Sequence, residues 1–481
     1  MSNPKLFQSH GLHSPSRCSS VSTSRPFYHS AKCLLLLAVA LTCRVTAASQ
    51  AIQMVAEFQE SGKGPQVPYG RLVLGTNGAF YGTTFFGGNS DLGTVFKFSP
   101  GSAPVVLTAF NGANGQHPYY GGLMRAADGN FYGNTYLGGV SNSGTIFRIS
   151  HEGAFTNLVS FRTTNGASPR GWLTQAADGN FYGTTFGGGV GNRGTVYRMT
   201  PAGALNTIHF FNNTNGANPD AGLVEAPDGG LYGTTLAGGT NNLGTIFRIT
   251  TNGLLTSLIS FTGTNGTCPG SSPFAALVRG SNGYLYGTTQ LGGNADYGTV
   301  FRVSTNGDFT TLHSFSATNG AYPEASLVEG ADGWLYGTTA GSVFDGGSAT
   351  NGTVFAISLL GQFSSLANFD YTVGPEPVSS LTLGADGNFY GTTLYGGLEG
   401  LGALYRLVTP PIITAIAATN GSVTLTWTAF SNGVYRVEHK PAVDSPGWTP
   451  LATNIIATGN TASRTDNPGN TNRIYRVNLL P

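Results

Sequence analysis

The residues that could do chemistry in this sequence are mostly repeated ones. Five aspartates occupy one recurring position before a glycine: Asp128, Asp178, Asp228, Asp332 and Asp386. A catalytic pair of carboxylates would break a repeat, whereas an aspartate in a turn accepts hydrogen bonds from backbone amides two residues on. We therefore interpret these aspartates as turn residues, and the sequence signals no catalytic residue.

Two other groups of residues match part of a known binding motif but lack the sequence context that the motif requires. Residues 189–194 have the glycine spacing of a dinucleotide-binding loop, but no helical pattern follows them. Four histidines are scattered without a partner at the spacing that zinc requires: His117, His151, His209 and His313. We expect neither a cofactor nor a metal ion.

Where the repeats differ, one position carries side chains that suit recognition. It follows the proline that precedes each first strand, and it holds Tyr69, Tyr119, Arg170, Asp220, Phe274, Glu324 and Val378. If the first strands are innermost, these side chains ring one mouth of a central channel. Aromatic rings stack on the C–H faces of sugars, while arginine and carboxylates bind hydroxyl groups.

The candidate ligand-binding residues are therefore six members of that set: Tyr69, Tyr119, Arg170, Asp220, Phe274 and Glu324. The alternative is that these are variable loop positions without a function.

A repeated tetrapeptide predicts the elements that position this ring. Tyr-Gly-Thr-Thr or a close variant begins at intervals of 50 to 54 residues, at Tyr81, Tyr132, Tyr182, Tyr232, Tyr286, Tyr336 and Tyr390. Each repeat contains four short runs rich in β-branched and aromatic residues, separated by Asp-Gly, Asn-Gly or Gly-Gly turns. Four hairpin-linked strands per repeat are typical of a β-propeller blade. Such sheets bury both faces only by packing against neighbours.

The first segment of the predicted mature chain supplies a strand that the last repeat lacks. No fourth strand follows residues 402–407, whereas residues 52–58 have the fourth-strand pattern, with Ile52, Val55 and Phe58 at its apolar positions. We predict an all-β fold: a seven-bladed β-propeller over residues 49–409, with four strands per blade and the N-terminal strand closing the last blade.

The repeated unit carries a family resemblance. Its sequence, Asp-Gly-Asn-Phe-Tyr-Gly-Thr-Thr, then Gly-Gly, then Gly-Thr-Val-Phe-Arg, resembles the GloVer tandem repeat of bacterial choice-of-anchor surface proteins over about residues 51–409. The resemblance implies export and surface display in a family without an assigned biochemical activity. It brings no catalytic residues.

Residues 1–48 have the features of a secretory signal region. Basic residues extend to Lys32, an apolar run covers residues 33–43, and small residues follow at 45–48. The apolar run is shorter than the roughly 20 residues that a membrane-spanning helix needs. We expect an exported protein, extracellular or at the cell surface, without a membrane span in the mature chain.

A different pattern begins after Thr409-Pro410-Pro411. In residues 410–481, Val423, Leu425 and Trp427 alternate with threonines, as in a half-buried strand. Together with Tyr435 and the Tyr-Arg-Val run at 475–477, this alternation resembles a fibronectin type III-like β-sandwich. Such modules usually serve as spacers or attachment elements.

The charge balance disfavours one class of partner. The chain has 23 basic and 22 acidic residues, but five basic and no acidic residues precede residue 49. The remainder has 18 basic against 22 acidic residues, a net charge of −4, so we expect no nucleic-acid partner.

These observations favour a monomeric, non-catalytic surface protein that binds a carbohydrate or another envelope component. Two alternatives stay open. A propeller-fold glycosidase or lyase would need two carboxylates at a fixed separation in an open cleft. A purely structural envelope protein would bind no soluble ligand.

Overall fold

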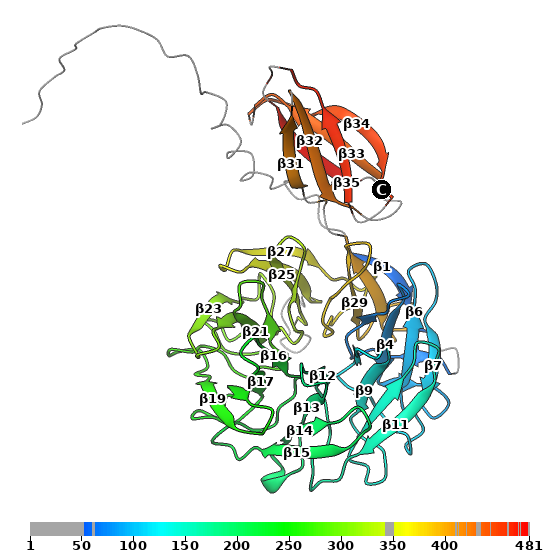
Figure 1. Cartoon of the computed structure of the whole chain (residues 1–481), viewed down its shortest axis with the longest axis vertical. Coiled ribbons are helices and arrows are strands. Elements are labelled where there is room, and N and C mark those ends of the chain that lie inside the picture. The colour runs from blue at the N-terminus through cyan, green and yellow to red at the C-terminus, as the bar shows by residue number, and fades with distance from the viewer. Residues whose placement is uncertain are drawn as a thin grey trace, which may run out of the picture. The chain divides into compact units, whose positions relative to one another are not determined.

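The computed structural model describes residues 52–59, 63–341, 351–408, 411, 413–419, 421–429, 434–442, 444–458, 461–469, 471 and 473–479. Within these ranges the chain is strand and turn, except for the 3-10 turn Val190–Asn192. The repeats form antiparallel sheets of four strands (Figure 1). The prediction of an all-β fold built from repeated four-stranded units is confirmed. The predicted signal region, residues 1–48, lies outside the described residues.

Each repeat begins with two strands joined by the Asp-Gly or Asn-Gly turn. The first strands are short: β3 (Val73–Leu74), β8 (Leu123–Arg125), β12 (Thr174–Gln175), β16 (Val224–Glu225), β20 (Val278–Arg279), β24 (Val328–Glu329) and β28 (Thr382–Leu383). The second strands carry the tetrapeptide: β4 (Phe80–Thr84), β9 (Phe131–Thr135), β13 (Phe181–Thr185), β17 (Leu231–Thr235), β21 (Leu285–Thr289), β25 (Trp334–Thr339) and β29 (Phe389–Thr393).

Two outer strands complete each sheet. The third strands are β6 (Thr94–Phe98), β10 (Thr145–Ile149), β14 (Thr195–Met199), β18 (Thr245–Ile249), β22 (Thr299–Val303), β26 (Thr353–Ser358) and β30 (Ala403–Leu407). The fourth strands are β7 (Val105–Ala109), β11 (Phe155–Ser160), β15 (Leu205–Phe210), β19 (Leu255–Ser260), β23 (Phe309–Ser314) and β27 (Phe363–Asn368). A two-stranded ribbon, β2 (Pro65–Gln66) with β5 (Phe86–Gly87), accompanies the first sheet.

β1 (Ile52–Glu57) is the fourth strand of the last sheet. It pairs antiparallel with β30, with Ile52 opposite Leu407. Phe58, which follows β1, is buried, with its ring 5.3 Å from that of Phe96 in the first sheet. The backbone N–H of Phe58 donates to the carbonyl oxygen of Gly402 (3.0 Å). The residues just after the predicted signal region are therefore integrated into the last sheet.

Packing between the second and third strands explains the Tyr-Gly-Thr-Thr motif. A Cβ atom added to Gly82 would lie 2.6 Å from the ring of Phe96, so only glycine leaves room for that ring. The hydroxyls of Thr84 and Thr94 lie 2.6 Å apart across the two strands, and five further sheets contain the equivalent pair. The motif recurs because every sheet needs the same packing.

The repeated aspartates fix the turn that leads into the second strand. Asp128 Oδ1 accepts the backbone N–H of Asn130 (3.0 Å), and Asp128 Oδ2 accepts the hydroxyl of Tyr132 (2.9 Å). The other four aspartates accept the equivalent two hydrogen bonds. Their interpretation as turn residues is confirmed.

The apolar core lies between the sheets. Six hydrophobic clusters each combine buried residues from two sheets that follow one another in the chain, and a seventh combines the last sheet with the first. Tyr81 of the first sheet stacks on Phe131 of the second, with 4.3 Å between ring centroids. Phe80 lies 4.5 Å from Tyr390 of the last sheet. Each sheet therefore has both faces covered by its neighbours.

The C-terminal residues form two three-stranded antiparallel sheets. One contains β31 (Ile413–Thr419), β32 (Ser422–Thr428) and β35 (Thr461–Asp466), and the other contains β34 (Thr449–Ile456), β33 (Val434–Lys440) and β36 (Ile474–Leu479). Buried residues from both sheets, among them Trp427, Tyr435 and Val477, share one hydrophobic cluster.

The packing of Phe58 generates a stability prediction. We expect Phe58→Ala to lower the free energy of unfolding by about 3 to 5 kcal/mol, because it removes a buried ring between the last and first sheets. Met54, in the adjoining strand β1, is 44% exposed, and Met54→Ala should change the stability by no more than about 0.5 kcal/mol. Urea unfolding of both variants measures the difference, and equal midpoints would contradict the packing role of Phe58.

Candidate functional site

The segments that lead into the first strands of all seven sheets line one central cavity. Its lining includes Tyr69, Tyr120, Trp172, Asp220, Phe274, Glu324 and Val378. The free volume inside it is about 20 Å³, which is room for roughly one water molecule. Side chains therefore fill the centre, and the cavity itself admits no larger ligand.

A repeated backbone arrangement holds each lining segment in place. The residue before each proline has a positive φ: Val67, His117, Ser168, Asn218, Ser272, Tyr322 and Glu376. The His117 backbone N–H donates to the Leu92 carbonyl of the preceding sheet (2.7 Å), and the His117 carbonyl accepts from Tyr136 of its own sheet (3.1 Å). Residues other than glycine seldom adopt this conformation unless their surroundings hold it. The equivalent pair of backbone hydrogen bonds holds the residue before the proline in the other six lining segments.

Four of the six predicted ligand-binding residues line the cavity: Tyr69, Asp220, Phe274 and Glu324. Tyr119 and Arg170 are not among the lining residues. Both lie beside it, since the Tyr119 ring is 4.9 Å from Tyr69 and an Arg170 guanidinium nitrogen is 3.1 Å from Asp220 Oδ1.

Tyr120, which sequence reasoning missed, connects the lining residues across the centre. Its hydroxyl donates to Glu324 Oε2 (3.1 Å), and its ring lies 5.4 Å from Tyr69 and 6.3 Å from Phe274. The second repeat has one extra residue between its proline and the leucine of its first strand. Counting back from the leucine, in place of forward from the proline, would have found Tyr120.

Asp220 and Arg170 form an ion pair beside the cavity. The carboxylate of Asp220 is only 1% exposed. Burial raises the pKa of Asp220 to about 6, although the Arg170 guanidinium opposes the shift. Asp220 Oδ2 is buried without a hydrogen-bond partner in the described part of the chain. The central carbon of the Arg170 guanidinium also lies 3.7 Å from the centroid of the Phe186 ring.

Glu324 is held by two hydrogen bonds. Besides the Tyr120 hydroxyl, it accepts the side-chain N–H of Gln290 (2.7 Å). Burial raises the pKa of Glu324, and these two hydrogen bonds oppose the rise. Both carboxylates of the predicted set therefore serve as acceptors for neighbouring side chains.

Arg71 and Trp172 form a second layer of the lining that sequence reasoning missed. The Arg71 guanidinium carbon lies 4.1 Å from the Trp172 ring centroid, and burial lowers the pKa of Arg71 to about 10. Glycine makes room for the indole, because a Cβ atom at Gly222 would lie 2.7 Å from Trp172 Cδ1. The sequence did contain a signal for both residues. Arg71 and Trp172 occupy the position before the leucine that leads into the first strand, and the other repeats have only glycine, alanine or serine at this position.

Partly exposed aromatic side chains extend outward from the cavity over the first three sheets. We call Tyr69, Phe85, Tyr119, Tyr136 and Phe186 the aromatic arc. Ring centroids are 5.5 Å apart for Tyr69 and Phe85, 4.9 Å for Tyr69 and Tyr119, and 5.9 Å for Tyr119 and Tyr136. The residues that follow the second strand in the other four sheets are Leu236, Gln290, Ala340 and Leu394. The position after the second strand is therefore aromatic only in the first three sheets.

The buried Asp220 carboxylate generates a prediction about pH dependence. Because its pKa is about 6 in the folded chain and 3.8 ordinarily, the folded state binds more protons in between. Its contribution to stability is full below about pH 4 and is lost as the pH rises through 6, a loss of up to roughly 3 kcal/mol. Asp220→Asn should remove this component. Chemical unfolding of both proteins between pH 4.5 and 7.5 measures it, and parallel pH profiles would contradict it.

The described residues were also compared with the requirements of a metal site and of a membrane-spanning helix. They contain no cluster of three or more histidine, cysteine, aspartate or glutamate side chains that could hold a metal ion. In the same ranges no helix has the length and apolar character that a membrane crossing needs.

Comparison with solved structures found several distant likenesses. A candidate 6-phosphogluconolactonase from Bacteroides fragilis is 16% identical, with 80% of this chain and 98% of that chain covered and a TM-score of 0.40. A xylan β-1,4-xylosidase from Bacillus halodurans is 13% identical, with 88% and 100% covered and a TM-score of 0.30. An endo-1,4-β-xylanase from Bacteroides thetaiotaomicron is 15% identical, with 52% and 96% covered and a TM-score of 0.32. At these TM-scores the likenesses carry no argument about function.

The repeat itself has a clear match. A comparison with curated proteins found no matching protein. The model of the Gloeobacter/Verrucomicrobia repeat family, however, matches residues 40–225, 172–272 and 227–435. These overlapping matches cover most of the chain and confirm that its repeated unit is of the GloVer type. The chain belongs to the Gloeobacter/Verrucomicrobia repeat family.

Proposed function

We propose that this chain is a non-catalytic, exported or cell-surface repeat protein whose aromatic arc binds carbohydrate. The observation that carries the proposal is that the arc residues occupy positions at which the residue type differs from one sheet to the next. Where packing alone decides, as in Tyr-Gly-Thr-Thr, the sheets have the same residues. After the second strand, three consecutive sheets instead present Phe85, Tyr136 and Phe186, each partly exposed to solvent.

The arc has the geometry that sugar recognition needs. Four of its rings, Phe85, Tyr69, Tyr119 and Tyr136, are linked by centroid distances of 4.9 to 5.9 Å, and they offer apolar faces on which the C–H face of a pyranose ring can stack. The Arg170 guanidinium lies among three rings of the arc, 5.2 Å from Tyr119, 5.1 Å from Tyr136 and 3.7 Å from Phe186, and it is paired with Asp220. The planar guanidinium has further N–H donors for sugar hydroxyls.

The central carboxylates support binding over catalysis. A glycosidase needs two carboxyl groups about 5 to 9.5 Å apart, with the scissile bond between them. Here Asp220 is paired with Arg170, and Glu324 accepts from Tyr120 and Gln290. The cavity that they line has a free volume of about 20 Å³, which leaves no space for a glycosidic bond. The raised pKa values of both carboxylates would suit an acid catalyst and keep the enzyme as the second candidate.

The proposal includes a domain plan. Residues 1–48 are a signal region for export, and residues 49–409 form a closed seven-bladed β-propeller with β1 as its closing strand. Support comes from the pairing of β1 with β30, from the hydrophobic cluster shared by the last and first sheets, and from the Val67 N–H bond to the Leu401 carbonyl (2.9 Å). Residues 410–481 form a fibronectin type III-like β-sandwich that serves as a spacer or attachment element.

A glycan-binding screen followed by matched variants tests the carbohydrate proposal. For the best-binding glycan, Tyr136→Ala should weaken the affinity about tenfold or more, because it removes a stacking surface. Leu236→Ala changes the equivalent position of the fourth sheet, outside the arc, and should leave the affinity unchanged. Isothermal titration calorimetry measures both.

Three results would contradict the proposal. Binding that survives alanine at Tyr69, Tyr119 and Tyr136 together would place the ligand elsewhere. Cleavage of the bound glycan, detected by product analysis, would favour the enzyme. Absence of binding to every glycan tested would favour a structural envelope protein.

A further inference from the structure

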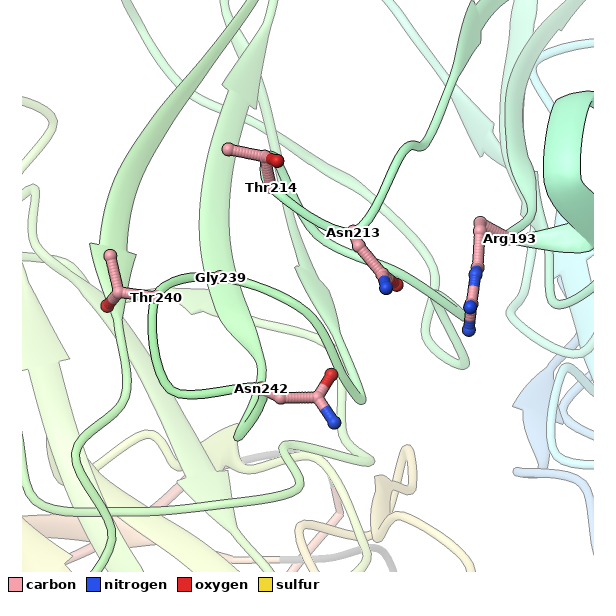
Figure 2. Close-up of a pocket in the computed structure, with 6 residues that line it drawn as sticks. All are labelled: Arg193, Asn213, Thr214, Gly239, Thr240 and Asn242. Carbon is pink, nitrogen blue, oxygen red and sulfur yellow. The ribbon is translucent and has the colours of Figure 1, made fainter.

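A larger hollow lies on the loops of the third and fourth sheets, and it shares no lining residue with the central cavity. Its volume is about 450 Å³, within the usual range for small-molecule sites. Figure 2 shows the six residues that line it: Arg193, Asn213, Thr214, Gly239, Thr240 and Asn242. We call this hollow the outer groove.

Backbone hydrogen bonds hold the three segments that form the outer groove. The Arg193 carbonyl accepts the N–H of Asn218 (2.8 Å), and the Asn213 carbonyl accepts the N–H of Gly239 (2.8 Å). Asn242 Oδ1 accepts the N–H of Gly238 (3.0 Å), which fixes the orientation of its carboxamide. The frame of the groove is therefore set before any ligand arrives.

The lining side chains are polar and rich in donors. Those of Arg193, Asn213, Thr214 and Thr240 make no hydrogen bond within the described residues, and the lining contains no carboxylate and no aromatic ring. In Figure 2 the Asn213 carboxamide extends toward the Arg193 guanidinium. The groove thus offers one positive charge together with amide and hydroxyl groups.

Arg193 breaks the repeat at the position before the third-strand glycine. The equivalent residues are Leu92, Ser143, Leu243, Tyr297, Asn351 and Leu401. The three leucines and the tyrosine pack against hydrophobic clusters between sheets. Of the seven residues only Arg193 is classed as exposed. The fold therefore accepts an apolar side chain at this position, so packing does not require an arginine.

Asn213 contributes a second side chain to the outer groove. Its φ is 73°, in the left-handed region, as in the equivalent residues Gly112 and Gly263, which have φ values of 86° and 77°. The equivalent residues in three other sheets are Thr163, Ala317 and Tyr371. Glycine adopts this conformation without steric cost. At Asn213 the chain instead places a carboxamide in the lining of the outer groove.

We propose that the outer groove binds an anionic sugar, a single sugar ring that carries a carboxylate or a sulfate group. The Arg193 guanidinium matches the paired oxygens of such a group, and the amide and hydroxyl side chains bind the ring hydroxyls. The site is independent of the aromatic arc. Its donor set lacks the apolar surface on which a neutral sugar stacks and lacks the carboxylates that would repel an anion.

Titration of the full chain with matched sugars tests the proposal. Glucuronate and glucose 6-sulfate are the anionic probes, glucose is the neutral control, and inorganic sulfate represents the anion alone. We expect glucuronate, glucose 6-sulfate or both to bind about tenfold or more tightly than glucose and sulfate, with an affinity that falls as the salt concentration rises. Saturation-transfer NMR or calorimetry measures the affinities.

Two variants that copy other repeats locate the site. Arg193→Leu installs the residue of three other repeats and should weaken binding of the anionic sugar about tenfold or more while the thermal unfolding midpoint is kept. Asn213→Gly copies Gly112 and Gly263 and should weaken binding without loss of stability. Tyr136→Ala, in the aromatic arc, should leave this binding unchanged. The experiment therefore distinguishes failure of the outer-groove proposal from failure of the aromatic-arc proposal.

Four outcomes would overturn the inference. Equal affinity for glucose and both anionic sugars would show that the charge plays no part, and equal affinity for inorganic sulfate would reduce the groove to an anion site. Binding by Arg193→Leu at the original affinity would place the ligand elsewhere. No binding of either anionic sugar to the unaltered chain would remove the site.

Discussion

Each four-stranded sheet has two apolar faces, and the structure depends on covering both of them with neighbouring sheets. The hydrophobic clusters lie between sheets, and one of them joins the last sheet to the first. This packing is tight, since the glycine of the tetrapeptide is needed only because an aromatic ring of the third strand occupies the space beside it. A side chain there would separate the two strands. The same steric condition recurs in every repeat and explains why the motif varies so little.

That condition also separates structural residues from candidate functional ones. Positions under packing constraint are the same in most sheets, as with the threonine pairs and the aspartates that accept tyrosine hydroxyls. Positions that differ without a packing reason are the central lining, the aromatic arc and Arg193. Functional sites in repeat proteins usually lie where loops project from a rigid scaffold. The central lining, the aromatic arc and Arg193 fit this description, because they lie outside the strands and the strands themselves remain regular.

The sequence was sufficient for the repeated sheet because the tetrapeptide and its turns are local signals. It was sufficient for part of the central site, since Tyr69, Asp220, Phe274 and Glu324 do line one cavity. Tyr120 was missed because an inserted residue shifts the second repeat by one position, and counting from the proline selected Tyr119. Comparing the repeats could have singled out Arg71, Trp172 and Arg193 as departures, but their partners could not be predicted because the Arg71–Trp172 contact and the outer groove each join side chains from different sheets. Their contacts depend on spacing between sheets, which no local pattern encodes.

The ion pair of Arg170 and Asp220 shows why the central lining is more than a filled core. Burial of the Asp220 carboxylate raises its pKa to about 6, and one of its oxygens has no hydrogen-bond partner among the residues that the structure describes. Its charged form therefore makes the fold less stable at neutral pH. Well-packed apolar residues often replace a buried ion pair without loss of stability. The equivalent positions include Phe274 and Val378, which shows that the fold accepts apolar side chains there. What the pair provides is a guanidinium held by contacts with both Asp220 and the Phe186 ring. An arginine that is already held in place among the rings of the aromatic arc loses little conformational freedom when it binds a ligand, which favours recognition over stability as the reason for the pair.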